Sequence, residues 1–309
     1  MRKEEFKFRS VNDDVDIRAV QYIPEGEPKA ILQIAHGMVE FIDRYDGFAE
    51  YLCDRGFLVT GNDHVGHGGS INTEEDWGYF GYDGNNVLLD DMYQLYEITR
   101  ESYPDLPYFL LGHSMGSFYA RQYLTRHGED LTGAIIMGTG HQPLPVVKAG
   151  MAMCKTMAKF KGWDYRWSFL DKISFGSYNK RFEPARTRAD WLSKDTDLVD
   201  WYVNEPRCSF TFTLNAYYYM FEGIANLHDR KLLEKIPKDL PLFFVSGQDD
   251  PVGSFGKEVQ AAVDSLKDVG VKNIEMKLYP NDRHEILNET DKEVVYEDLY
   301  KWMDQYIEG

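Results

Sequence analysis

Ser114 stands in the sequence Gly112-His-Ser-Met-Gly116, a pattern in which a serine hydroxyl can become a nucleophile. An apolar run over residues 108–111 precedes the pattern and a helical pattern follows it, which is the strand–turn–helix context of a nucleophile elbow. The flanking glycines permit a turn tight enough to push the hydroxyl out above a sheet. The sequence therefore predicts that Ser114 is a nucleophile rather than part of an ordinary strand–helix turn.

A serine hydroxyl needs a base, and the base needs an acid that orients it. Among the eight histidines, His284 lies after the last predicted strand, in a loop expected at the same edge of the sheet as Ser114. The acid should follow the preceding strand, where Asp249 and Asp250 stand side by side, and their chemistry alone does not separate them. The order serine, aspartate, histidine is the one found in α/β-hydrolases.

The tetrahedral intermediate of acyl transfer carries an oxyanion, which two backbone N–H groups would have to stabilise. One should be the N–H of Met115, which directly follows the serine at the start of a helix. For the second we expect the N–H of Met38, in the loop that follows the predicted strand at residues 30–35. Glu40 either holds this loop by hydrogen bonds or is solvated, and the sequence leaves both alternatives open.

Asp63, His64 and His67 could be interpreted as metal ligands, because they offer three donors within one short segment. They lie in a glycine-rich turn after a predicted strand, without a further ligand cluster, so a structural, hydrogen-bonded role is the better interpretation. Arg44 and Tyr45, at the start of a predicted helix, are interpreted as packing or capping residues. We expect neither a metal ion nor a cofactor.

Short apolar runs alternate with helical patterns through most of the chain, and such runs are typical of parallel strands covered by helices on both faces. The predicted strands are residues 30–35, 57–61, 108–111, 133–137, 241–246 and 274–279, with 6–9 and 15–22 as an antiparallel edge pair. The predicted helices are residues 45–55, 87–102, 115–127, 257–269 and 292–307. This alternation predicts a doubly wound, mostly parallel α/β sheet.

The strand–helix alternation stops near residue 140 and resumes near residue 240. The intervening segment is rich in aromatic residues, and its first part has an excess of basic residues in an otherwise acidic protein. We therefore expect a core formed by residues 1–140 and 239–309, with a mainly helical cap, residues 141–238, inserted into it. The cap tryptophans are expected to form its core and a pocket wall together: Trp163, Trp167, Trp191 and Trp201.

Lysines and methionines are interspersed between residues 148 and 161 in a pattern that predicts a basic amphipathic helix. Such a helix can lie transiently on an anionic membrane surface, and methionine can also line a pocket for varied acyl chains. The favoured interpretation is a cap helix that buries its apolar face on the core and exposes its lysines. Membrane contact through the cap is the alternative.

The 309-residue chain carries 34 basic and 51 acidic residues, a net charge of −17. Such a surface would repel a phosphate backbone, so nucleic acid is not expected as a partner. The sequence begins without an apolar signal segment and contains no apolar run long enough to cross a membrane. Three widely spaced cysteines indicate reduced thiols, and we expect a cytoplasmic protein. The oligomeric state stays open.

Several motifs together resemble the monoacylglycerol lipase/lysophospholipase family of α/β-hydrolases. His36-Gly-Met-Val-Glu-Phe-Ile-Asp-Arg-Tyr45 is similar to the family's HGxxE…RY loop, and Asp63-His-Val-Gly-His-Gly-Gly-Ser70 to its DHxGHGxS segment. GHSMG, the Asp250-Pro-Val loop and Arg283-His-Glu-Ile-Leu-Asn-Glu289 complete the set in the family order. The resemblance implies an α/β-hydrolase fold and a serine esterase acting on single-chain lipid esters. It also favours Asp250 as the acid.

The leading hypothesis is a carboxylic ester hydrolase that acts on a monoacylglycerol or lysophospholipid through Ser114, Asp250, His284 and an acyl-enzyme. A second hypothesis keeps these residues but cleaves an amide, as an aminopeptidase would, or a short-chain ester. A free-amine substrate would need cap carboxylates, and several are available: Glu183, Asp190, Asp195, Asp197, Asp200 and Glu205. A third hypothesis is a non-enzymatic protein of this fold that binds a hydrophobic ligand, which the complete set of motifs disfavours.

Overall fold

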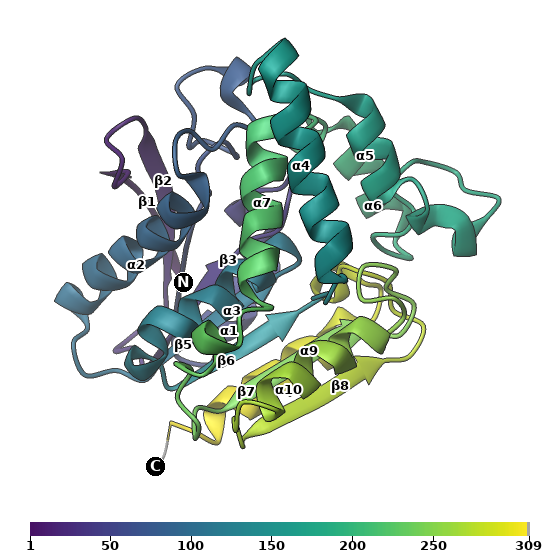
Figure 1. Ribbon diagram of the computed structural model, residues 1–309. Helices are drawn as coiled ribbons and strands as arrows, with labels where there is room; N and C mark the ends of the chain where they lie inside the picture. Colours follow the sequence, from purple (N-terminus) through teal and green to yellow (C-terminus); the bar gives the residue numbers. More distant parts are fainter. Residues whose placement is uncertain (308–309) are drawn as a thin grey trace.

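An eight-stranded sheet forms the centre of the protein in the computed structural model, which describes residues 1–307 (Figure 1). The strand order is β1–β2–β4–β3–β5–β6–β7–β8. Strands β3 to β8 are parallel, whereas β1 pairs with β2, and β2 with β4, in antiparallel fashion. The bounds are β1 Arg2–Arg9, β2 Asp16–Ile23, β3 Ala30–Ala35, β4 Phe57–Asn62, β5 Tyr108–His113, β6 Gly133–Met137, β7 Leu242–Gly247 and β8 Ile274–Tyr279. The predicted doubly wound, mostly parallel sheet is confirmed.

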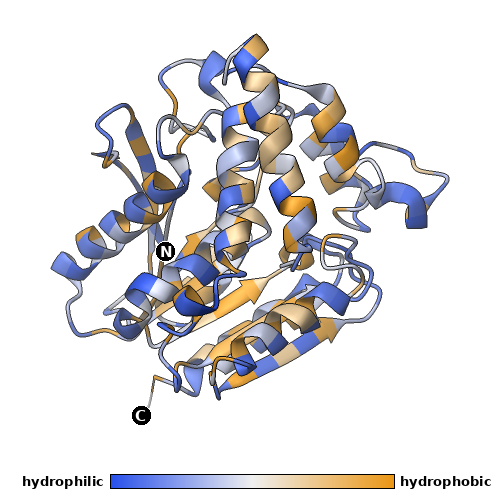
Figure 2. Cartoon of the chain, viewed as in Figure 1, coloured by the Kyte–Doolittle hydropathy of each residue, from blue (hydrophilic) through white to orange (hydrophobic). Residues whose placement is uncertain are grey.

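Strands β3 to β7 are buried along their whole length, because helices cover both faces of the sheet. This is why the sequence shows continuous apolar runs there rather than an alternating pattern. The edge strands β1 and β8 alternate between more and less exposed side chains. In Figure 2 the central strands are largely orange and the outer helix α2 is mainly blue, as this arrangement requires.

Helices pack on both faces and make two separate hydrophobic clusters with the sheet. One cluster contains α1 and α10, and the other contains α2, α3 and α9. The bounds are α1 Asp46–Cys53, α2 Gly84–Ser102, α3 Met115–His127, α9 Lys257–Lys267 and α10 Lys292–Asp304. Short 3-10 helices occupy Ile42–Tyr45, Glu74–Asp76, Gly128–Asp130, Tyr178–Phe182, Pro206–Cys208 and Ile286–Asn288. Thus the predicted helix at 45–55 is entered through a 3-10 turn, and α2 begins at Gly84 rather than at residue 87.

The chain between β6 and β7 forms a helical segment, called here the inserted segment (residues 138–241). It contains α4 Leu144–Lys161, α5 Ser168–Phe175, α6 Thr196–Asn204, α7 Leu214–Asn226 and α8 Arg230–Leu233. Figure 1 shows α4 and α7 side by side above the sheet, and the two helices contact each other along their length. Helix α7 also contacts α2 and α3, so the inserted segment is packed directly on the core.

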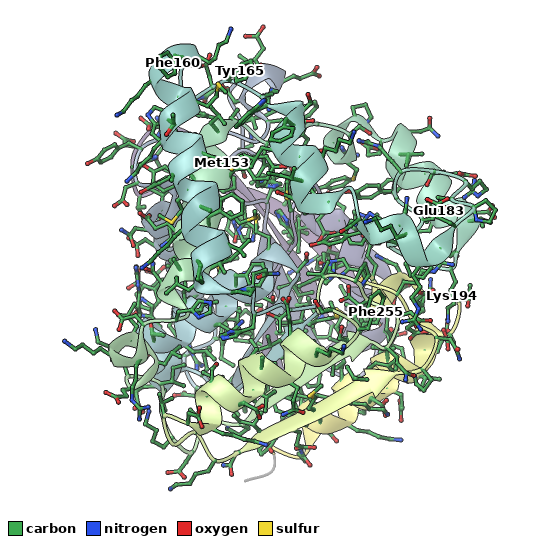
Figure 3. All side chains as sticks on the ribbon, turned by 45° about the vertical axis from the view of Figure 1, so that its right-hand side comes forward. Met153, Phe160, Tyr165, Glu183, Lys194 and Phe255 are labelled. Atoms are coloured by element: carbon green, nitrogen blue, oxygen red, sulfur yellow. The ribbon has the colours of Figure 1, made fainter. Side chains whose placement is uncertain are left out.

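Helix α4 buries one face and exposes its lysines. Val147, Gly150 and Cys154 are buried, while the methionines are partly buried against the main cluster. Phe160 is not part of this buried face: it is 81% exposed at the outer end of the helix (Figure 3). Among the predicted cap tryptophans, Trp163 and Trp201 are also exposed, so they are not core residues.

Within residues 1–307, no helix combines the length and the apolar composition needed to cross a lipid bilayer. Over the same range, no three histidine, cysteine, aspartate or glutamate side chains converge in a way that could hold a metal ion. The three cysteines, Cys53, Cys154 and Cys208, are buried free thiols.

Candidate active site

Ser114 occupies a sharp turn between the end of β5 and the start of α3. Its φ of +52° and ψ of −118° are values that a residue with a side chain adopts only under constraint. The Ser114 N–H donates to the carbonyl of Met137 at 2.9 Å, which ties the turn to the end of β6. A Cβ on Gly116 would lie 2.1 Å from the carbonyl oxygen of Ala35, and one on Gly112 would lie 2.4 Å from the carbonyl oxygen of Gly116. The tight packing of the turn therefore requires both glycines.

His284 and Asp250 form a buried pair. The Nδ1 atom of His284 lies 2.9 Å from Oδ2 of Asp250, and the side chains are 2% and 0% exposed. The carboxylate also accepts the Ser246 hydroxyl at 3.0 Å and the Val252 N–H at 2.8 Å. Asp249, in contrast, pairs with Arg181 at 2.8 Å and is 24% exposed. Of the two adjacent aspartates, the structure brings Asp250 to the histidine.

The end of β6 brings the histidine and the serine into one place. Gly138 follows Met137, the residue that accepts the Ser114 N–H, and a Cβ on Gly138 would lie 3.0 Å from Cε1 of His284. Gly138 has a φ of +60°, so glycine suits this position in both conformation and size. The imidazole of His284 is therefore packed on the same strand end that fixes the Ser114 turn.

The loop after β3 lies against the other side of Ser114. A Cβ on Gly37 would lie 3.1 Å from the Cβ of Ser114, which places this backbone in contact with the serine. Met38 follows and is partly buried, and Val39 has a φ of +56°. The Val39 carbonyl accepts the Tyr202 hydroxyl at 3.1 Å. Met38 directly follows Gly37, which touches Ser114, and Met115 directly follows Ser114 itself. Each residue predicted to donate to the oxyanion thus lies directly after the serine or directly after a residue that touches it.

Glu40 is buried and holds this loop, so the first of its two sequence interpretations describes the structure. Its Oε1 accepts the Gly37 N–H at 2.5 Å and the Tyr45 hydroxyl at 3.0 Å, and lies 3.0 Å from Nδ1 of His113. Its Oε2 accepts from Arg44 at 2.7 Å. Burial alone would raise the pKa of Glu40, but the hydrogen bond with His113 and the charge of Arg44 outweigh it and hold that pKa well below its ordinary value. Glu40 is therefore a carboxylate.

Arg44 has a structural role, as the sequence predicted, but it acts through buried ion pairs rather than through helix capping. Its guanidinium is 2% exposed and bridges two carboxylates, Glu40 and Glu285. The contacts to Glu285 are bidentate, at 2.7 Å and 2.5 Å. The four-residue spacing of Glu40 and Arg44 was a signal for an ion pair, but nothing in the sequence indicated the contact with Glu285, the neighbour of His284.

The predicted hydrogen-bonded role of the glycine-rich turn holds for Asp63 but not for the ring of His64, whose two nitrogens are buried without a hydrogen-bond partner among the described residues. His36 Nε2 accepts the backbone N–H of His64 at 2.9 Å, and Asp63 accepts the backbone N–H groups of Ile42 and Gly69. Burial lowers the pKa of His36 and of His67 to about 3, so both rings are neutral at pH 7. The turn therefore supplies a dry, hydrogen-bonded support next to the loop of Gly37.

Part of the inserted segment is joined to the loop that carries His284. The backbone N–H of Glu285 donates to the carbonyl of Leu192 at 2.8 Å, and that of His284 to the carbonyl of Trp191 at 3.4 Å. The Lys194 ammonium, labelled in Figure 3, donates to Asp282 at 2.6 Å. The residues around 191–194 and the loop around 282–289 are thus held together by backbone and side-chain contacts.

The fold and the strand–turn–helix setting of Ser114 define the protein as an enzyme of the serine hydrolase class with an α/β-hydrolase fold. A family model described as "Serine aminopeptidase, S33" matches residues 26–291, and the chain belongs to this family. The non-enzymatic alternative is thereby set aside.

Proteins similar to this chain carry lipase and esterase names. A monoglyceride lipase homolog of Monkeypox virus is 26% identical over 89% of this chain and 90% of its own length. The monoglyceride lipase of Rattus norvegicus is 40% identical over 59% of this chain and 54% of its own length. The crystal structure of a thermostable carboxyl esterase from Bacillus coagulans is 33% identical, covers 99% of both chains and superposes with a TM-score of 0.92. These matches confirm the resemblance to monoacylglycerol lipases seen in the motifs.

Proposed function

We propose that the protein hydrolyses the carboxylic ester of a single-chain lipid, a monoacylglycerol or a lysophospholipid, with Ser114 as nucleophile. The observation that carries the proposal is the buried pair of His284 and Asp250 packed on the strand end that fixes the strained Ser114 turn. The relatives named as monoglyceride lipases support the lipid ester as substrate.

The reaction follows from the roles that this geometry permits. Ser114 Oγ attacks the ester carbonyl carbon while His284 Nε2 takes the hydroxyl proton, and Asp250 holds the imidazole in the correct tautomer. The N–H groups of Met38 and Met115 stabilise the oxyanion. The bond to the alcohol oxygen then breaks, and the alcohol leaves with the proton from His284. Water attacks the acyl-enzyme, gives a proton to the histidine, and the acid leaves as Ser114 regains its proton.

We further propose that the inserted segment, with residues 141–238 as its core, acts as a cap that binds the acyl chain. Partly buried apolar side chains of this segment support this role, among them Met151, Met153, Met157, Phe175 and Phe221. Met38 and Val39 add apolar surface on the loop next to the serine. Such surfaces suit an unbranched hydrocarbon chain better than a charged group.

Lipid contact at the outer end of the cap is part of the same proposal. Phe160 is 81% exposed at the end of α4, next to the exposed Lys159 and Lys161, and Phe169 and Ile173 on α5 are each 51% exposed. Apolar side chains among lysines suit an anionic lipid surface, in which a single-chain ester would be dissolved. Helix α4 itself buries its apolar face on α7, so the contact would involve only the outer end of the cap.

Amide hydrolysis is the second candidate, because the family description names an aminopeptidase. A free amine would need an uncommitted carboxylate in the inserted segment. Asp190 and Asp195 accept backbone N–H groups of their own turns, and Asp200 and Glu205 pair with arginines. Glu183 also accepts a backbone N–H, that of Ala185, so within residues 1–307 only the exposed Asp197 of the six candidate carboxylates lacks such a contact. The commitment of the other five favours the ester over the aminopeptidase substrate.

The test is a panel of substrates with a matched pair of serine variants. The panel holds p-nitrophenyl esters of increasing chain length, a monoacylglycerol, a lysophospholipid and an aminoacyl anilide. We expect the lipid esters to be preferred, Ser114→Ala to abolish turnover and fluorophosphonate labelling, and Ser265→Ala on α9 to retain both. Preference for the anilide would favour the second candidate, and turnover by Ser114→Ala at the wild-type rate would refute the assignment of the nucleophile.

A further inference from the structure

The Glu40 carboxylate lies where three loops of the site meet. It accepts the N–H of Gly37 in the oxyanion loop, contacts His113 directly before the serine, and reaches the histidine loop through Arg44 and Glu285. Arg44 forms ion pairs with both Glu40 and Glu285, and each of these three side chains is 4% exposed or less. No step of the reaction described above requires them.

We infer that Glu40 is the positioning residue of the oxyanion hole: its carboxylate fixes the backbone that presents the Met38 N–H to the substrate. The inference rests on the proposed function and deepens it. Glu40 does not touch the reacting atoms, so it acts through the loop of residues 37–39.

The geometry of the loop gives the physical reason. The Met38 N–H lies between two anchored points, the Gly37 N–H held by Glu40 at 2.5 Å and the Val39 carbonyl held by the Tyr202 hydroxyl at 3.1 Å. An oxyanion donor is effective only when its direction is set before the charge develops. Glycine at position 37 restricts the backbone little, and Val39, a β-branched residue, adopts its positive φ only at a cost in free energy. The two anchors must therefore hold the loop in this conformation.

A carboxylate suits this role better than a neutral acceptor. Oε1 accepts from several donors at once, and the guanidinium of Arg44 fixes the other oxygen. A hydrogen bond to a charged acceptor is stronger than one to a neutral acceptor. Glutamine could keep its carbonyl oxygen for the Gly37 N–H and the Tyr45 hydroxyl, but it would then present its NH₂ group to Arg44. Alanine would leave the buried Gly37 N–H without its acceptor and would take from Arg44 one of its two carboxylate partners, leaving only Glu285.

The experiment compares Glu40→Gln and Glu40→Ala with Asp91→Asn. Asp91 is a matched control, because it is also buried and accepts a hydroxyl and a backbone N–H, from Ser10 and Val11 outside the site. For each variant, kcat and KM are measured on a p-nitrophenyl ester. Inhibition is measured with a trifluoromethyl ketone, whose serine adduct carries an oxyanion, and with the corresponding alcohol, which forms none.

We expect Glu40→Ala to lower kcat roughly 100-fold with KM changed by less than about threefold, as for the loss of an oxyanion donor. Affinity for the trifluoromethyl ketone should fall by a similar factor while affinity for the alcohol is kept. Glu40→Gln should lie between Glu40→Ala and the wild type, and Asp91→Asn should keep the wild-type kcat. Unchanged ketone affinity, or a kcat within threefold of wild type, in folded Glu40→Ala would overturn the inference.

Tyr202→Phe keeps the test decisive if Glu40→Ala does not fold. This variant releases the second anchor without leaving a buried charge, and we expect parallel losses of kcat and ketone affinity of roughly threefold to tenfold. If Tyr202→Phe and Glu40→Gln both keep wild-type ketone affinity, the loop does not need its anchors and the inference fails. If instead the proposed function is wrong, the wild-type enzyme will show no preference for lipid esters, or Ser114→Ala will keep its fluorophosphonate label. Neither result depends on the anchors of the loop.

Discussion

The indole of Trp191 lies over the imidazole of His284, with ring centroids 5.1 Å apart and planes inclined by 40°. The two residues come from distant parts of the chain, the inserted segment and the loop after β8. Tyr178 supports the indole edge-on from within the inserted segment, at 4.9 Å. These aromatic rings cover the imidazole, which is 2% exposed.

Trp191→Ala should lower kcat roughly tenfold, because water would reach the imidazole and the ring would lose the surface that orients it. Trp191→Phe, which keeps an aromatic ring there, should stay within about threefold of wild type. Steady-state kinetics on one soluble ester would measure both effects. Equal kcat values for the alanine variant and the wild type would show that the indole has no part in orienting the histidine.

Asp250→Asn and Asp249→Asn should differ sharply, although the residues are neighbours. Asparagine at position 250 replaces one carboxylate oxygen by an NH₂ group, which can donate to Nδ1 of His284 and so favours the wrong tautomer. We therefore expect kcat to fall roughly 10⁴-fold. Asp249 contacts Arg181 at the surface, so its substitution should change kcat by less than about threefold. The rate of fluorophosphonate labelling gives a second measure of each variant. Similar losses in both would mean that the pairing seen here is not the functional one.

Gly116→Ala and Gly47→Ala should change stability in opposite directions. A Cβ at position 116 would lie 2.1 Å from the Ala35 carbonyl, so we expect a loss of more than about 3 kcal/mol in the free energy of unfolding. A Cβ at position 47, in α1, would meet only the Tyr296 hydroxyl at an ordinary 3.4 Å, and the better helix propensity of alanine should add about 0.5 kcal/mol. Urea unfolding measures both, and a stable Gly116→Ala protein would contradict the packing described here.

The burial of His67 should make the protein less stable as pH falls. Burial lowers the pKa of His67 in the folded state to about 3, from an ordinary value of 6.5, so below pH 6.5 the unfolded chain binds a proton that the folded chain does not. Stability from this residue is complete above pH 6.5 and decreases as pH falls toward 3. His67→Phe, which suits the surrounding Phe80, Phe210 and Phe212, should reduce the slope by up to about 1.4 kcal/mol per pH unit. Urea unfolding between pH 7 and pH 5 would measure this, and an unchanged slope would mean that His67 titrates normally.

Phe160→Asp should weaken activity on lipid presented in anionic vesicles, because it places a charge at the exposed outer end of α4. We expect a decrease of about fivefold or more with vesicles and no change with a short, soluble ester. Val294→Asp is the matched control, since Val294 is 57% exposed on α10. Equal losses in the two variants, or none with vesicles, would contradict the proposed lipid contact.

The sheet could be predicted from the sequence because its strands are short apolar runs buried on both faces, as β3 and β5 illustrate. The end of β5 was also marked by local chemistry, the glycines around Ser114. The strands at the edges were harder to bound: β1 was expected at residues 6–9 but begins at Arg2, because an exposed edge strand needs no apolar side chains.

Contacts between distant segments could not be predicted in the same way. Asp249 and Asp250 have the same local chemistry, and only the path of the loop after β7 turns one of them to His284. Arg44 and Glu285 are 241 positions apart in the sequence, and no pattern in the sequence predicts that they pair. The exposure of Phe160 likewise depends on where α4 extends beyond α7 and not on helical spacing.

The junction between residues 191–194 and the histidine loop limits how this enzyme could be redesigned or could diversify. An inserted segment transplanted from a relative would need a complementary loop around residues 282–289, since Leu192 and Lys194 contact their partners across that boundary. No backbone hydrogen bond to the histidine loop is made by α4 or α5 within the described residues. Changes in substrate range should therefore accumulate in the outer helices, while the two sides of the junction change together.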